Sequence, residues 1–125
     1  MAYKPGQYLG ENGNIDYEEL AGEAERIDSE ENPEKVITLL EPYRNDSNNN
    51  SSLFYYFLGS AYNKLGREKE AVDLYNKSIK LDSSNCLPYF DLYVSSMEKG
   101  EDEEASVFLH EYLTRAKVFI EKYAK

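Results

Sequence analysis

The chain has 125 residues, of which 41% are hydrophobic and 14% aromatic, and its formal net charge at pH 7 is −10. This length and apolar content support one compact domain with its own core. An acidic chain repels phosphate backbones and anionic lipid, so we expect neither nucleic acid nor a membrane surface as a partner. No stretch resembles a signal peptide or an apolar membrane span, and we therefore expect a soluble, cytoplasmic protein.

The first fifteen residues contain three glycines and one proline among isolated apolar residues. This composition favours an irregular N-terminal lead-in over residues 1–15, followed by a single helical domain over residues 16–125. Asp16 with Glu19 three residues later forms an acidic capping box, with Ile15 before it as a possible hydrophobic staple. The first helix is therefore predicted from about Tyr17 to Ser29.

A second helix start follows at Asn32-Pro33, an N-cap residue before a proline at the first helical position. The helix is predicted from Pro33 to about Arg44, and Pro42 can bend or end it. The polar segment 45–52 is then predicted to be a linker.

Residues 52–85 form a 34-residue unit in which small and aromatic residues occur where two antiparallel helices must touch. The residues that carry the pattern are Tyr55, Leu58, Gly59, Tyr62, Ala71 and Tyr75. Their spacing resembles that of the tetratricopeptide repeat, although Ser78 and Ser83 replace the usual alanine and proline. Gly59 and Ala71 are small enough for the two helix backbones to approach closely.

Weaker copies of this register occur on both sides. The first unit matches at Leu20, Ala24, Ile27, Val36, Leu40 and Tyr43, and the third matches at Tyr89, Leu92, Ala105, Leu109 and Tyr112. Pro88 marks a helix start, Lys99-Gly100-Glu101 a turn, and the last helix is predicted from about Asp102 to Tyr123. The resemblance implies an all-α fold, a right-handed α-solenoid of three helix-turn-helix units (about 17–51, 52–85 and 86–125) with a long C-terminal helix.

No catalytic constellation emerges from the sequence. His110 is the only histidine and Cys86 the only cysteine, and no nucleophile, base or metal-ligand set converges on either. We expect His110 to be a surface or half-buried residue and Cys86 a buried filler. The sequence therefore predicts a non-enzymatic protein without a cofactor or a metal.

Acidic residues concentrate near the N-terminus. Ten of them lie between Glu11 and Glu34, against one base, Arg26. Such a surface either serves solubility alone or attracts a cationic partner.

In the tetratricopeptide family the first helices of successive repeats line a concave groove, and the resemblance implies which residues face it here. The expected partner-binding groove consists of Glu18, Glu25, Asp28, Leu53, Tyr56, Phe57, Ser60, Asn63, Lys64, Leu87, Phe90, Asp91, Val94 and Met97. It would be acidic at one end and apolar in its middle, because its large apolar residues are not needed for the seam between helices. The implied partner is a protein or peptide that is apolar with basic residues, bound by an adaptor or a client chaperone.

Two alternatives stay open. The lead-in, through Tyr3, Tyr8 and Leu9, or a fold-back of the last helix could cover the groove. The apolar residues Phe108, Leu113, Phe119 and Ile120 could instead drive assembly of a structural subunit into a homodimer or larger homo-oligomer, unless the last helix bends over the third unit and caps it.

Overall fold

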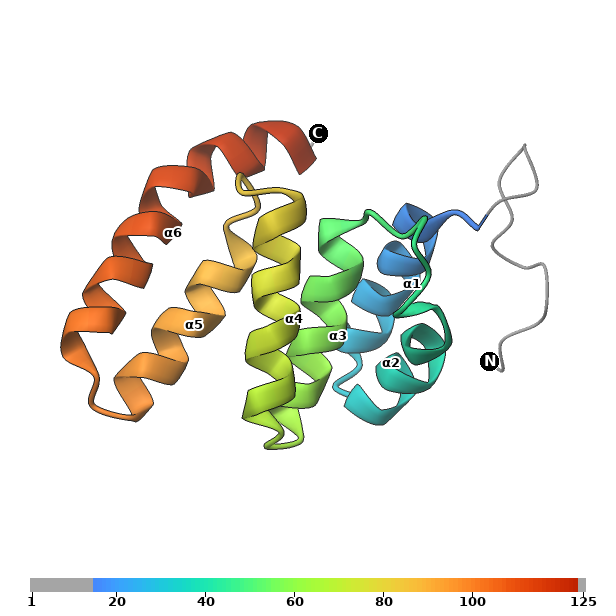
Figure 1. The fold of residues 1–125 in the computed structure, drawn as a ribbon, viewed down its shortest axis with the longest axis horizontal. Helices are drawn as coiled ribbons and strands as arrows, with labels where there is room; N and C mark the ends of the chain where they lie inside the picture. The colour runs from blue at the N-terminus through green and yellow to red at the C-terminus, as the bar shows by residue number, and fades with distance from the viewer. Residues whose placement is uncertain (1–14, 124–125) are drawn as a thin grey trace.

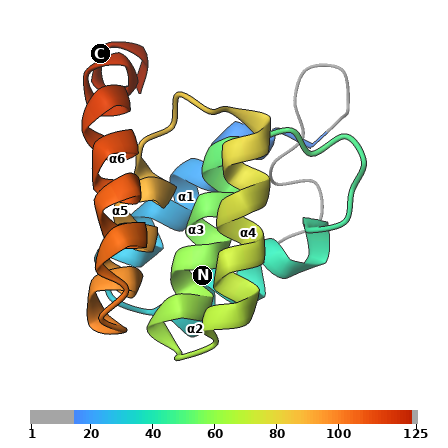
Figure 2. The same cartoon turned by 60° about the vertical axis from the view of Figure 1, so that its left-hand side comes forward.

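The computed structural model describes residues 15–123, which form three consecutive helical hairpins laid side by side (Figures 1 and 2). The hairpins are α1 (Tyr17–Ser29) with α2 (Pro33–Leu40) and the 3₁₀ turn η1 (Glu41–Tyr43), α3 (Ser52–Lys64) with α4 (Glu68–Leu81), and α5 (Leu87–Glu98) with α6 (Asp102–Tyr123). The predicted all-helical solenoid is confirmed over this range. Residues 1–14, with Tyr3, Tyr8 and Leu9, lie outside the described part of the chain.

Local capping sets where the helices begin. The Asp16 side chain accepts a hydrogen bond from the backbone N–H of Glu19 at 3.0 Å, and Asn32 accepts one from Lys35 at 3.2 Å. Pro42 has no N–H to continue the α-helical ladder, so α2 ends at Leu40 and the chain continues as η1. The second helix is therefore shorter than the predicted Pro33–Arg44 span.

The three hairpin turns occupy the same position in the three predicted units. Gly66 and Gly100 adopt positive φ angles of 79° and 73° there, and Glu31 takes the same position with a φ of 56°. Glycine adopts this conformation without steric cost, whereas glutamate does not. The first hairpin therefore carries local strain that the other two avoid.

Helices α3 and α4 cross closely at Gly59. A Cβ atom added to Gly59 would lie 3.0 Å from Cδ1 and Cε1 of Tyr75 and 3.2 Å from Cβ of Leu74. Tyr75 is only 2% exposed, so its ring has little room to retreat. The prediction that Gly59 permits a close helix crossing is confirmed.

The hairpins stack in chain order. Helix α3 packs on both α1 and α2, α5 packs on α4 more than on α3, and α6 packs on α5. The last turns of α6 curve past the end of α5 toward α4 (Figure 1). Arg115 Nε donates a 2.7 Å hydrogen bond to the carbonyl oxygen of Ser83, and Lys122 Nζ lies 2.6 Å from the carboxylate of Asp82. The second half of α6 is therefore held against the segment that connects α4 with α5.

Candidate partner-binding surface

The predicted groove residues lie on α1, α3 and α5, whose surface we call the inner-helix surface. The exposed members are Glu18, Glu25, Asn63, Lys64, Phe90, Val94 and Met97. Asp28, Leu53, Tyr56, Leu87 and Asp91 are half-buried, and Phe57 and Ser60 are buried. About half of the predicted set thus presents open surface.

The apolar part of this surface is a stripe along α5. Phe90, Val94 and Met97 are 39%, 38% and 49% exposed, and their spacing of four and then three residues places them on one face of the helix. We call these three residues the α5 stripe. Exposed apolar side chains gathered on one helix face favour contact with another molecule.

Phe57 departs from the sequence interpretation. Its ring is 6% exposed and belongs to the core cluster, so the expectation that it is left over after the core has formed is wrong. Ala21 and Ala24 of α1 belong to the same cluster, and α1 packs on α3. Leu53 also packs against this core, and Ser60 is buried.

Tyr56 and Asp91, both assigned to the groove, instead join two repeats. The hydroxyl groups of Tyr56 and Tyr75 donate hydrogen bonds to the two carboxylate oxygens of Asp91, at 3.3 Å and 2.8 Å. The two tyrosine rings stack with centroids 5.9 Å apart. Burial raises the pKa of Asp91 above its ordinary value, although both hydrogen bonds act in the opposite direction. The carboxyl group therefore links α3 and α4 to α5.

The charged end of the surface is partly neutralised within the chain. Lys64 of α3 forms an ion pair with Asp28 of α1. Arg26 pairs with Glu23 and, at 2.9 Å, with Glu30. Glu18 and Glu25 are exposed, so they are the groove acids best placed to meet a basic ligand.

A second buried polar cluster was not foreseen from the sequence. The Ser52 and Ser78 hydroxyl oxygens lie 2.9 Å apart, and Asn85 Nδ2 donates to Ser52 Oγ at 3.0 Å. Asn85 Oδ1 accepts a hydrogen bond from the backbone N–H of Leu87 at 3.1 Å. The hydroxyl of Ser78, where the family usually has alanine, thus helps to fix the start of α5 to the α3–α4 hairpin.

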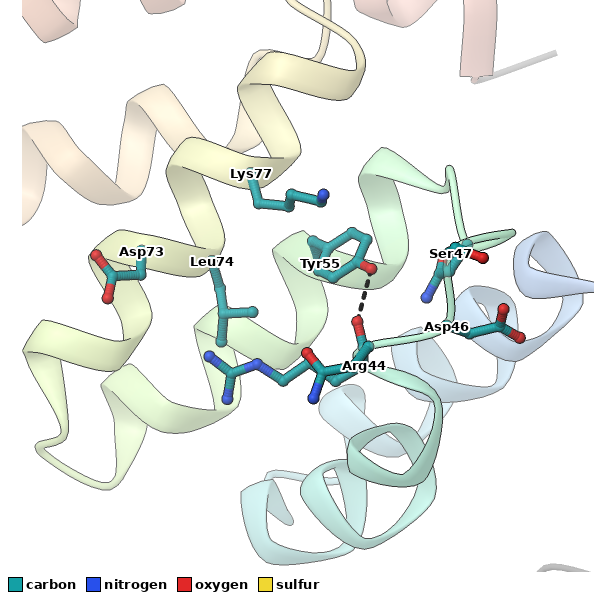
Figure 3. A pocket seen from close by; sticks show the side chains of 9 residues that line it. Arg44, Asp46, Ser47, Tyr55, Asp73, Leu74 and Lys77 are labelled. Atoms are coloured by element: carbon teal, nitrogen blue, oxygen red, sulfur yellow. Dashed lines mark hydrogen bonds between the residues drawn. The ribbon is translucent and has the colours of Figure 1, made fainter.

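The structure also contains two cavities away from the α5 stripe. One of about 310 Å³ lies between α4 and the 44–49 segment (Figure 3). The Tyr55 hydroxyl donates a 2.8 Å hydrogen bond to the carbonyl oxygen of Arg44 in its wall, and Lys77 Nζ lies 5.5 Å from the Tyr55 ring centroid. The other, of about 410 Å³, is bordered by Glu18, Asn50, Ser52, Leu81, Asp82 and Lys122.

The structure also places the histidine and the cysteine singled out in the sequence. His110 is exposed, and Cys86 is buried at the start of α5, where burial raises the pKa of its thiol. Within residues 15–123, no group of three or more His, Cys, Asp or Glu side chains could hold a metal ion. A search of the described helices found none long and apolar enough to cross a bilayer.

Comparison with known proteins identifies one of the hairpins. Residues 53–85 match the tetratricopeptide repeat model. This segment of the chain is a tetratricopeptide repeat. The chain is similar to the TPR repeat-containing protein MJ1428 of Methanocaldococcus jannaschii, with 44% identity over 64 residues. That match spans 51% of this chain and 11% of the relative. No solved structure gave a significant match. Tetratricopeptide repeats generally mediate contacts between proteins.

Proposed function

We propose that this protein is a non-enzymatic interaction module that binds a segment of another protein along the inner-helix surface, as an adaptor or as a chaperone for one client. The observation that carries the proposal is the α5 stripe, three exposed apolar residues on a face shared with predicted groove positions. Helical and extended peptides commonly bind such surfaces through apolar anchors at regular spacing.

The charges on α1 define the other half of the ligand. Glu18 and Glu25 are exposed, whereas Asp28 is paired with Lys64. A lysine or arginine of the ligand would meet the first two acids, because opposite charges across an interface favour encounter and orientation. The ligand is therefore an apolar segment with a basic end, its apolar side chains on α5 and its basic end toward α1.

Selection from a phage-displayed library of random 16-residue peptides tests this proposal. We expect enriched peptides to combine two or more large apolar residues with lysine or arginine. Enrichment of acidic peptides, or no enrichment, would contradict the proposal.

The binding surface is then checked with variants that leave the core intact. Phe90→Ala with Met97→Ala should weaken binding of a selected peptide about tenfold or more, because apolar anchors dominate such contacts. Val107→Ala is the matched control, since Val107 is 59% exposed but lies on α6. Fluorescence anisotropy measures affinity, and circular dichroism verifies that helicity is unchanged.

A further inference from the structure

The second half of α6 has little apolar burial. In the first half, Ala105 is 1% exposed and Phe108 packs against the core cluster. None of the described side chains of residues 113–122 is buried, and the side chain of Phe119 lies outside the described part of the structure. We call residues 113–122 the α6 arm. A segment with few buried apolar contacts opens locally at a low free-energy cost, so this arm is the part of α6 that separates most readily.

Two cationic side chains hold the α6 arm in place. Arg115 Nε donates a 2.7 Å hydrogen bond to the carbonyl oxygen of Ser83, and the guanidinium lies 4.9 Å from the Tyr89 ring centroid. Near the end of the helix, Lys122 Nζ lies 2.6 Å from a carboxylate oxygen of Asp82, and the Lys122 side chain is 53% exposed. Exposed ion pairs are weak and are screened by salt, so another cation can readily replace this lysine.

Lys122 borders the same cavity as an acid of the inner-helix surface. The last turns of α6 curve toward α4 (Figure 1), and the cavity of about 410 Å³ lies between them and the starts of α1 and α3. Its wall includes Glu18, Asp82 and Lys122. Glu18 is exposed and is one of the two acids proposed to meet the basic end of a ligand. The Lys122 ammonium is therefore placed at the acidic end of the proposed binding surface.

We propose that the α6 arm is an autoinhibitory segment, in which Lys122 occupies the acidic end of the inner-helix surface until the basic end of a ligand displaces it from Asp82. This inference rests on the proposed function, because it describes the regulation of the same binding surface. Among the described residues that border the cavity, Lys122 is the only cation and Glu18 and Asp82 are the acids. A lysine or arginine of the ligand would compete with Lys122 for these two carboxylates, because like charges at one site repel each other.

Hydrogen exchange of the full chain, followed by mass spectrometry, tests the α6 arm without a ligand. Lys122→Gln should make the backbone amides of residues 116–122 exchange about two- to fivefold faster, because the arm loses its outermost ion pair. Lys117→Gln is the matched control, since Lys117 is exposed in the same half of α6 but does not border the cavity. This control should exchange at the wild-type rate. Equal rates in the two variants would overturn the proposal.

Trilysine amide tests the displacement with a soluble cation that has no apolar anchor. At millimolar concentration it should accelerate exchange of the α6 arm in the wild type more than sodium chloride of equal ionic strength does. It should have no such effect on Lys122→Gln, in which the ion pair is already absent. Equal acceleration by trilysine and sodium chloride would indicate general screening and would overturn the displacement.

Peptide affinity separates this inference from the proposed function. A library-selected peptide with a basic end should bind Lys122→Gln about two- to fivefold more tightly than the wild type, and unchanged affinity would overturn the autoinhibition. Val94→Ala with Met97→Ala should weaken binding of that peptide but leave exchange of the α6 arm unchanged, because both residues lie toward the other end of α5. Displacement of the arm by trilysine without binding of any selected peptide would contradict the proposed function alone.

Discussion

The hydroxyl of Tyr75 donates a 2.8 Å hydrogen bond to the carboxylate of Asp91, and so connects the last helix of the second hairpin to the first helix of the third. The ring of the same tyrosine fills the space beside Gly59. One buried side chain therefore sets both the crossing of α3 with α4 and the position of α5, which carries the apolar part of the proposed binding surface.

Gly59→Ala should destabilise the protein by about 1–2 kcal/mol, because the added methyl group overpacks a core that cannot readily yield. Its Cβ would lie 3.0 Å from two ring atoms of Tyr75, a side chain that is anchored at its hydroxyl by Asp91. Urea denaturation monitored by circular dichroism measures the change.

Gly22→Ala is the matched control for this substitution. Gly22 is also helical, but a Cβ added there would meet nothing within 4 Å. This variant should gain about 0.5–1 kcal/mol from the better helix propensity of alanine. Equal effects of the two substitutions would contradict the close crossing.

Asp91→Asn should change how stability depends on pH. Since burial raises the pKa of Asp91 above its ordinary 3.8, ionising this group costs more in the folded than in the unfolded chain. The wild type should therefore lose stability relative to the Asp91→Asn variant as the pH rises from about 3.8 through the folded pKa, and the difference should then level off.

Paired urea titrations of the wild type and the Asp91→Asn variant across this range provide the measurement. The comparison cancels the titration of the other carboxylates, which both proteins share. A wild type that gains stability relative to the variant with rising pH would show that the two tyrosine hydrogen bonds outweigh burial.

Asn85→Ala should cost about 1–3 kcal/mol, because it removes a buried partner of the Ser52 hydroxyl and the cap on the N–H of Leu87. Asn63→Ala, at an exposed position of α3, should change stability by less than about 0.5 kcal/mol. The thermal unfolding midpoints of the two variants show whether the buried Asn85 amide stabilises the fold more than the exposed Asn63 amide does. Similar midpoints would argue against the buried cluster.

Glu31→Gly should stabilise the first hairpin by about 1 kcal/mol, since it relieves a positive φ that Gly66 and Gly100 accept at the same repeat position. Gly66→Ala should have the opposite effect. Differential scanning calorimetry measures whether the unfolding temperature rises in Glu31→Gly and falls in Gly66→Ala. A lower unfolding temperature for Glu31→Gly would contradict backbone strain at Glu31.

Much of the fold could be predicted from local sequence signals. Two helix starts are marked by Asp16 and Asn32, whose side chains accept a hydrogen bond from the backbone N–H three residues later. The end of α2 is marked by Pro42, which has no N–H to continue the helix. Gly59 was informative because a helix crossing this close requires a missing side chain.

The candidate site was harder to predict, because it depends on contacts between distant residues. Asp91 resembles any surface acid in the sequence, yet its partners lie 16 and 35 residues away. Phe57 occupies a position that usually faces the groove, but its ring belongs to the core cluster, which includes residues of α1 and α2. The repeat register predicted which residues occupy groove positions. The packing of the side chains around each of these residues determines whether it stays exposed.

The most direct test of partner binding on the inner-helix surface is chemical-shift mapping by NMR, with the ¹⁵N-labelled full chain and a peptide obtained by the library selection. We predict shifts concentrated at Phe90, Val94 and Met97, with further changes near Glu18 and Glu25. Shifts confined to α2, α4 or the cavity beside Tyr55 would contradict the account.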